Sequence, residues 1–313
     1  MKIAEKSFWY SNKYISFLPF ALKGISQVLL IDNAISGLLI ILGIMIYSPF
    51  LGSIAFLSSL FGTIIAVILG GNKEDLHKGL FGFNPTLTGT AAMFLVDSPF
   101  NWVIALIAAL LSSIVFLVLN HSIKNKNIPV LTLPFILTIW LMQLAAYHLN
   151  IFHVNPDFIA ESRTLFTFHP QDMPNFLLVL IKGISEVFLI DSLWAGLLIL
   201  MALFWAGWRY GVYTAMGTFA ALLTAHFLGI NTETIELGLF NFNAILAIIS
   251  VGLTFDIKQR KFPVIGIIAA MTSVIVTAGV NILVFPLGLS ALTLPFILTT
   301  WILLFVRNAF LKK

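Results

Sequence analysis

The sequence KGISQVLLID at residues 23–32 returns almost unchanged as KGISEVFLID at residues 182–191, 159 positions later. Two further segments behave in the same way. GLFGFN at residues 79–84 returns as GLFNFN at residues 238–243, and LTLPFILTIW at residues 131–140 returns as LTLPFILTTW at residues 292–301, with offsets of 159 and 161. Three segments in the same order at a nearly constant offset indicate a tandem duplication.

The composition indicates that lipid surrounds most of the chain. Of its 313 residues, 59% are hydrophobic and only 10% are charged, and the mean hydropathy is +1.02. A soluble domain has about 25% charged residues, and here the apolar runs are about as long as a bilayer is thick. The net charge of +4 does not indicate nucleic-acid binding, because the basic residues are scattered through short loops. There is no cysteine and therefore no disulfide. We expect no cleavable signal peptide, because no small-residue cleavage site follows the short apolar stretch 15–22.

The apolar runs predict an all-α polytopic membrane protein with two repeats of five spans, each preceded by a re-entrant half-helix. The first repeat comprises residues 1–149 and the second residues 173–313, and residues 150–172 form an extracytoplasmic linker. The half-helices are expected at 14–28 and 174–187. The expected spans are 34–48, 50–70, 80–96, 101–120 and 131–149 in the first repeat, and 192–207, 210–230, 238–254, 263–284 and 293–311 in the second.

An odd number of spans per repeat requires the second repeat to enter the membrane from the opposite side, so the repeats are predicted to be inverted. The loop charges support this independently, because positive residues concentrate in cytoplasmic loops. With both termini in the cytoplasm, that side collects Lys2, Lys6, Lys13, Lys73, Lys78, Lys124, Lys126, Arg209, Lys258, Arg260, Lys261, Arg307, Lys312 and Lys313. The outer loops hold Arg163 with Asp97, Asp157, Glu161, Asp172, Glu233 and Glu236.

Inverted repeats place a substrate site near the midplane, where discontinuous helices meet. Each half-helix ends at Gln27-Val28 or at Glu186-Val187. A helix that ends inside the membrane leaves up to four carbonyls without helical partners, so we expect a row of acceptors to which Gln27 and Glu186 add side-chain oxygens. The alternative is that these two residues only cap helix ends, although an intramembrane carboxylate usually has a function.

Each LTLPF segment is expected to begin the fifth span of its repeat, since proline favours the first turn of a helix. Thr132 and Thr293 then lie at helix starts, with hydroxyls free to face a cavity. The alternative is that they are N-cap residues without substrate contact. Asn84 and Asn241 also lie at predicted helix starts, where we expect them to act as caps.

Apolar walls are predicted next to these acceptors. Phe83 and Leu87 are four residues apart, as are Phe242 and Leu246, so each pair shares one helical face. Leu30 and Leu189 follow the half-helix ends. Such residues also occur in ordinary membrane-protein cores. Flat walls beside a line of acceptors nevertheless suit a small, planar, neutral solute with many donors.

The remaining polar residues do not indicate an enzyme. Lys23 with Asp32, and Lys182 with Asp191, are expected to form local ion pairs, because paired charges are less costly in a membrane. The six histidines show no metal-ligand spacing. No set of nucleophile, base and orienting residue is evident. We therefore expect no catalytic residue, no metal and no cofactor.

The doubled LTLPF segments, together with GIS[Q/E]V and GLFxFN, resemble the urea transporter family across residues 14–311. This resemblance implies a channel-like path for urea between inverted repeats, in a homotrimer surrounded by membrane lipid. It implies that the acceptor ladder is Gln27, Val28, Glu186 and Val187, and that Thr132 and Thr293 divide the path. It implies slot walls at Leu30, Phe83, Leu87, Leu189, Leu239, Phe242 and Leu246.

Two departures from the family pattern bear on the site. Aromatic residues often stand where this chain has Leu30 and Leu239, and Pro85 has Ala244 as its counterpart. Two functions remain open: passive urea transport, and ion-coupled transport of another small polar neutral solute, such as a short amide, with Glu186 carrying a proton. Both place the chain in the cell membrane, or in the inner membrane of a Gram-negative source.

Overall fold

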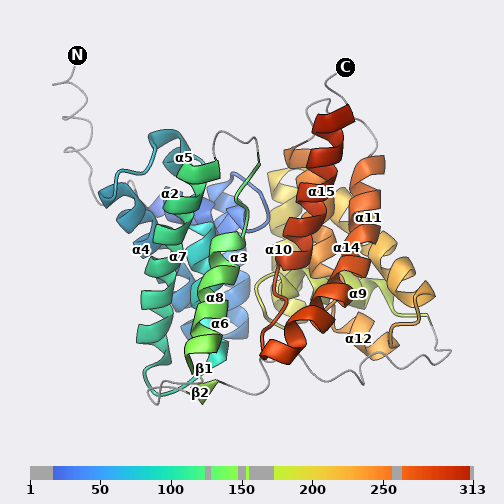
Figure 1. Ribbon diagram of the computed structural model, residues 1–313, viewed down its shortest axis with the longest axis horizontal. Coiled ribbons are helices and arrows are strands. Elements are labelled where there is room, and N and C mark those ends of the chain that lie inside the picture. Colours follow the sequence, from blue (N-terminus) through green and yellow to red (C-terminus); the bar gives the residue numbers. More distant parts are fainter. Residues whose placement is uncertain (1–16, 124–127, 147–152, 155–172, 256–262, 311–313) are drawn as a thin grey trace.

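The structure is a computed structural model that describes residues 17–123, 128–146, 153–154, 173–255 and 263–310 (Figure 1). Helices dominate the fold. The first part of the chain forms α2 (Phe17–Gln27), α3 (Ala34–Tyr47), α4 (Pro49–Ile68), α5 (Lys73–His77), α6 (Phe83–Leu95), α7 (Asn101–Ile123) and α8 (Leu133–Ala146). The second forms α9 (Phe176–Glu186), α10 (Leu193–Ala206), α11 (Trp208–Phe227), α12 (Thr232–Glu236), α13 (Phe242–Ile249), η4 (Ser250–Thr254), α14 (Val264–Val284), η5 (Phe285–Leu287) and α15 (Leu294–Phe310).

The helix boundaries repeat with the sequence. Helices α9, α10, α11 and α12 each begin and end 159 positions after α2, α3, α4 and α5, and α13 with η4 has the same offset from α6. Helix α15 begins 161 positions after α8. In Figure 1, α2 and α5 lie near the top of the molecule and their counterparts α9 and α12 near the bottom. Each predicted span overlaps a helix of the structure.

Several helices are shorter than a bilayer is thick, as the sequence predicted. Three helices among the described residues are long and apolar enough to cross a membrane by length and composition: Pro49–Ile68, Asn101–Ile123 and Val264–Leu287. The half-helices α2 and α9 have 11 residues each. At 1.5 Å per residue they extend about 16 Å, against about 30 Å of hydrocarbon. Neither can cross alone.

Two details depart from the predicted all-α fold. Strand β1 (Val96–Asp97) pairs antiparallel with β2 (His153–Val154), so a short β-ladder ties the predicted linker to the end of α6. The rest of 150–172 lies outside the described residues. The predicted span 238–254 also changes from α-helix to π-helix at Ser250, whose hydroxyl lies 2.8 Å from the Thr300 hydroxyl. A π-segment is usually found where function or packing requires an extra residue in a helix.

Glycine allows each half-helix to pack closely on the next helix. A Cβ atom at Gly37 in α3 would lie 1.8 Å from the carbonyl oxygen of Leu22 in α2. At the equivalent Gly196 in α10 it would lie 2.1 Å from the carbonyl oxygen of Ile181 in α9. Both distances are far shorter than van der Waals contact, so only glycine permits this approach. In both repeats, a glycine therefore allows the half-helix to pack closely against the following helix.

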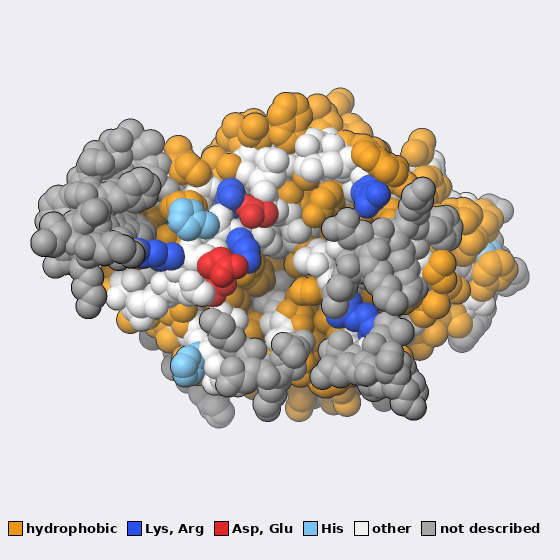
Figure 2. Space-filling model, turned by 90° about the horizontal axis from the view of Figure 1, so that it is seen from above, with side chains coloured by type: hydrophobic (Ala, Val, Ile, Leu, Met, Phe, Trp, Pro, Cys, Tyr) orange, Lys and Arg blue, Asp and Glu red, His pale blue; other side chains and the backbone are white. Residues whose placement is uncertain are grey.

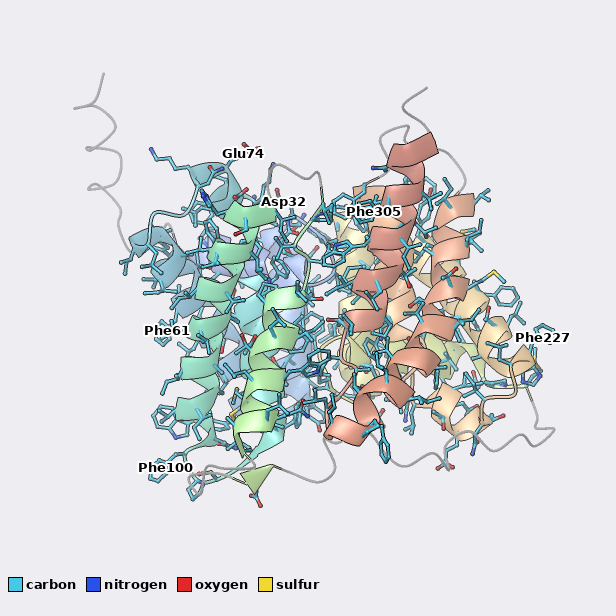
Figure 3. All side chains as sticks on the ribbon, viewed as in Figure 1. Asp32, Phe61, Glu74, Phe100, Phe227 and Phe305 are labelled. Atoms are coloured by element: carbon cyan, nitrogen blue, oxygen red, sulfur yellow. The ribbon has the colours of Figure 1, made fainter. Side chains whose placement is uncertain are left out.

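The two repeats share one interior. Helices α3 and α10 pack against each other, and the Ser36 hydroxyl of α3 donates to the Ala202 carbonyl of α10 at 2.8 Å. A single buried apolar cluster includes Ile40 of α3 and Ile199 of α10. Large apolar side chains cover the outside, and Phe61 and Phe227 project from opposite margins of the molecule (Figure 3). An apolar exterior of this kind suits contact with lipid chains.

Candidate functional site

Helix α2 ends inside the molecule in a Schellman turn. The amide of Ile31 donates to the Ser26 carbonyl at 3.2 Å, and the amide of Leu30 donates to the Gln27 carbonyl at 2.9 Å. Leu30 has the left-handed φ of 61° that this turn requires. Glycine normally occupies this position, and a leucine there costs about 1 kcal/mol or more. The surrounding packing must therefore hold Leu30 in place.

Helix α9 ends in the same way. The amide of Ile190 donates to the Ser185 carbonyl at 3.4 Å, and that of Leu189 donates to the Glu186 carbonyl at 2.9 Å, with φ of 61° at Leu189. The predicted row of unpaired carbonyls is thus wrong for Gln27 and Glu186, whose carbonyls already accept one bond each. A carbonyl oxygen has two lone pairs, so each keeps capacity for one further donor.

The side chains at the two half-helix ends differ. The Gln27 amide nitrogen donates to the Lys78 carbonyl at 2.8 Å, which ties α2 to the end of α5. The Glu186 carboxylate makes no hydrogen bond or ion pair within the part of the chain that the structure describes. An ionised carboxylate has no proton to donate, so Glu186 cannot reproduce the Gln27 contact while charged. Val28 and Val187, the next ladder positions, are both buried.

Ion pairs flank both half-helices, as the sequence predicted. Lys23 Nζ lies 2.7 Å from Asp32 and also donates to the His77 carbonyl at 2.9 Å. Lys182 Nζ lies 3.0 Å from Asp191. Asp32 and Glu74 lie at the upper end of the molecule (Figure 3), and Figure 2 shows charged side chains gathered on that face within an apolar rim. These partly exposed pairs connect each half-helix to the following helix.

The two threonines meet at the centre of the molecule. The hydroxyl oxygens of Thr132 and Thr293 are 2.7 Å apart, and both residues are buried. The expectation that each hydroxyl stands free before a cavity is therefore wrong, because each is the hydrogen-bond partner of the other. The alternative that the two threonine side chains cap α8 and α15 is also wrong, because asparagine side chains from other helices accept the amide hydrogen bonds at both helix starts.

An asparagine of α6 supplies the cap contact of α8. The Asn84 amide oxygen accepts from the Phe135 amide in α8 at 3.1 Å, and the Asn84 amide nitrogen donates to the Leu131 carbonyl at 3.2 Å. Asn84 therefore caps α8 rather than its own helix. Asn241 occupies the N-cap position of α13, as predicted, but its side-chain oxygen makes no cap bond, and its amide nitrogen donates to the Val179 carbonyl and the Thr218 hydroxyl.

The predicted wall residues lie beside these polar groups to different depths. Phe83 and Leu87 of α6, with Phe242 and Leu246 of α13, are buried. Leu30 and Leu189 are half-buried, and Leu239 is 37% exposed. The Phe83 ring meets the Phe116 ring edge to face, with centroids 5.7 Å apart. The first four belong to the buried apolar interior, and Leu239 lies nearer the surface.

Reciprocal tryptophan contacts join the two repeats on either side of the threonines. Trp140 of α8 donates to the Ser290 carbonyl at 2.8 Å, and Trp301 of α15 donates to the Pro129 carbonyl at 2.9 Å. The segment before each of these helices thus lies against the middle of the other helix. In the sequence, the one signal for these contacts is that Trp140 and Trp301 are equivalent positions of the two repeats, 161 residues apart.

The arrangement combines short helices that end in the interior, a central pair of hydroxyls and buried apolar side chains. No group of histidine and acidic side chains able to hold a metal ion occurs in the described ranges. Interrupted helices that meet inside an apolar bundle are typical of membrane transport proteins. Fold and site together place the chain in that class.

Comparison with known proteins identifies the family. The family model described as urea transporter matches residues 18–308, so the chain belongs to the urea transporter family. It is similar to Urea transporter 1 of Ovis aries, with 28% identity over 319 residues that cover 97% of this chain and 82% of that protein. It is also similar to Urea transporter 1 of Rattus norvegicus, with 27% identity over 307 residues that cover 96% and 80%. Proteins of this family are transporters and not enzymes.

Proposed function

We propose that this protein carries urea passively across the cell membrane, through a narrow channel-like path at the interface of its two repeats. The single observation that carries the proposal is the buried contact between Thr132 and Thr293. It places two hydroxyls from different repeats where the starts of α8 and α15 meet, and it adds no charge there. Such a centre offers hydrogen bonds to a neutral solute and nothing to compensate the lost hydration of an ion.

An inverted arrangement of the repeats forms part of the proposal. The reciprocal bonds of Trp140 and Trp301 support it, as do the positions of α5 and α12 near opposite ends of the molecule (Figure 1). The excess of basic residues in the loops assigned to the cytoplasm gives independent support. Both termini are then cytoplasmic.

The proposed path alternates acceptors with flat apolar walls. On entering it, urea loses several hydrogen bonds to water, and each unreplaced bond costs about 1–3 kcal/mol. The carbonyls and side-chain oxygens of Gln27 and Glu186, with the hydroxyls of Thr132 and Thr293, replace part of them. Several similar weak sites favour conduction over tight binding. Leu30, Phe83, Leu87, Leu189, Leu239, Phe242 and Leu246 form the walls in this proposal, and Val28 and Val187 add backbone acceptors.

A second candidate is proton-coupled transport, and one observation favours it. Glu186 carries a carboxyl group at a half-helix end without a hydrogen-bond partner in the described part of the chain. A carboxyl group in that position can gain and lose a proton during transport. The cargo would then be urea or another small neutral amide.

Flux measurements on purified protein in liposomes separate the two candidates. We expect urea efflux, followed by light scattering, to be equally fast with and without proton and sodium gradients. Thiourea and acetamide should be compared in the same vesicles. Liposomes without protein and liposomes with Thr132→Val protein provide the controls. Urea flux that requires an ion gradient would contradict the passive channel and support the coupled transporter.

A homotrimer is also proposed, from family resemblance together with the exposed apolar exterior. Mass measurement of the detergent-solubilised protein tests it directly, with three protein masses per particle as the expected result. A stable monomer with full urea flux would contradict the trimer and leave the transport proposal intact.

A further inference from the structure

The starts of α8 and α15 are held by residues from other helices. Asn84 lies in the first turn of α6, and its counterpart Asn243 lies in the first turn of α13. The Asn243 amide oxygen accepts from the Phe296 amide in α15 at 3.2 Å, and its amide nitrogen donates to the Leu292 carbonyl at 3.2 Å. These contacts duplicate those of Asn84 with Phe135 and Leu131. Both asparagines are fully buried.

Each asparagine holds a strained residue. Leu131 has a φ of 53° and Leu292 a φ of 50°, in the left-handed region that leucine rarely adopts. Each leucine immediately precedes a central threonine, and its carbonyl is the one that the asparagine binds. Such a conformation persists only where surrounding contacts enforce it. The asparagine amide group makes two of those contacts, one on each side of the threonine in the sequence.

We propose that Asn84 and Asn243 are positioning residues, which set the separation of the Thr132 and Thr293 hydroxyls and thereby the size of solute that passes them. Each asparagine bridges the residue before its threonine and the third residue after it. The hydroxyl contact of 2.7 Å depends on both helix starts, because each repeat contributes one threonine. This inference rests on the proposed urea path.

The main test compares variants of Asn84 with a buried control on the same helix. Asn84→Leu keeps the number and branching of side-chain heavy atoms and removes both hydrogen bonds, whereas Asn84→Asp keeps the acceptor for the Phe135 amide and loses the donor to Leu131. Thr90→Val is the control, because Thr90 is buried in α6 and its hydroxyl bonds only to the Thr86 carbonyl of its own helix. Size-exclusion elution and melting temperature check that each variant is folded.

We expect Asn84→Leu to lower urea flux about tenfold, since the loss of two buried hydrogen bonds displaces the threonine. The ratio of urea to N-methylurea flux should fall as well, because a displaced threonine discriminates size less well. Asn84→Asp should also lower urea flux, because a carboxyl oxygen then faces the Leu131 carbonyl oxygen in place of a donor. Thr90→Val should change neither quantity. Asn243→Leu should reproduce the Asn84→Leu result from the other repeat.

A double-mutant comparison distinguishes positioning from general stability. If Asn84 acts through Thr132, Asn84→Leu should reduce urea flux much less when Thr132→Val is already present. Equal fold reductions in both backgrounds, or unchanged flux and selectivity in Asn84→Leu, would overturn the inference. If the unmodified protein itself carried no urea, the proposed function would fail instead, so the two failures are distinguishable.

Discussion

The turns after α2 and α9 have the same backbone and differ in two side chains, Gln27 against Glu186 and Leu29 against Phe188. The turns after α2 and α9 share their hydrogen bonds, their left-handed leucines and their flanking ion pairs. Yet Gln27 is tied to the Lys78 carbonyl, whereas Glu186 has no such tie among the described residues. The backbone is therefore alike at the two half-helix ends, and the difference between them resides in side chains.

Substitutions at the close contact between each half-helix and the following helix should give the largest effect, which is a loss of stability. Gly37→Ala and Gly196→Ala each place a Cβ within 1.8 Å and 2.1 Å of a backbone carbonyl oxygen, and a backbone atom cannot move aside as a side chain can. Although alanine favours helix by about 1 kcal/mol, we expect each variant to lose folded protein or to melt at least about 10 °C lower. Fluorescence-detected elution after heating measures this. Gly279→Ala is the control, since no atom lies within 4 Å of its added Cβ. A large loss of stability in only one of the two variants would show that the two half-helices are not packed in equivalent ways.

The central threonines test symmetry at the middle of the path. Thr132→Val and Thr293→Val keep side-chain size, remove one hydroxyl and leave the other buried without its partner. We expect each to lower urea flux about tenfold and to lower the melting temperature by only a few degrees. The double variant should lose less than the product of the two, because each hydroxyl is the partner of the other. Unchanged flux in both single variants would remove the threonines from the path.

The half-helix ends should respond unequally. Gln27→Glu sets a carboxylate oxygen against the Lys78 carbonyl oxygen in place of a hydrogen bond of 2.8 Å. Two facing acceptors repel, so we expect urea flux to fall about three- to fivefold at neutral pH. Glu186→Gln should retain appreciable flux. Stopped-flow efflux on matched vesicles measures both. Complete loss of flux in Glu186→Gln would show that the charge or proton of Glu186 is required.

The tryptophan contacts should give the smallest effect and reveal a further asymmetry. Trp140 shares its contact point with Gln143, whose amide nitrogen donates to the Ser290 hydroxyl at 3.2 Å. Trp301 bonds to Pro129, and its helix has Leu304 where α8 has Gln143. Trp301→Phe should therefore lower the melting temperature by about 2–4 °C, and Trp140→Phe by less. A larger drop in melting temperature for Trp140→Phe than for Trp301→Phe would mean that Gln143 does not stabilise the contact with Ser290.

Much of the fold could be predicted from the sequence because the duplication and the apolar runs are local patterns. The predicted spans and half-helices match helices of the structure, and the pairs Lys23–Asp32 and Lys182–Asp191 form as expected. The two residues of each pair are only nine positions apart, on either side of one turn, so the pairing could be predicted from local sequence.

Most errors concern contacts between distant segments, whereas the unpaired carbonyls expected at Gln27 and Glu186 were a local error. Thr132 and Thr293 were placed at helix starts correctly, but their contact depends on how the repeats dock, which no local pattern contains. Asn84 was expected to cap the helix that it begins, and it caps α8 instead. The left-handed leucines could not be predicted, since leucine has almost no preference for that conformation and tertiary packing imposes it.

The hydrogen bond between the two threonines has two arrangements of its proton, because either hydroxyl can be the donor. In each arrangement, one threonine hydroxyl donates its hydrogen bond to the other threonine. The second hydroxyl accepts that bond and can donate its own hydrogen to another group. Exchange of the two roles needs only rotation of two light hydroxyl groups, with no movement of the backbone. A carbonyl that arrives from either repeat can therefore be met by a donor. In the proposed path, this central contact therefore favours neither direction of urea movement.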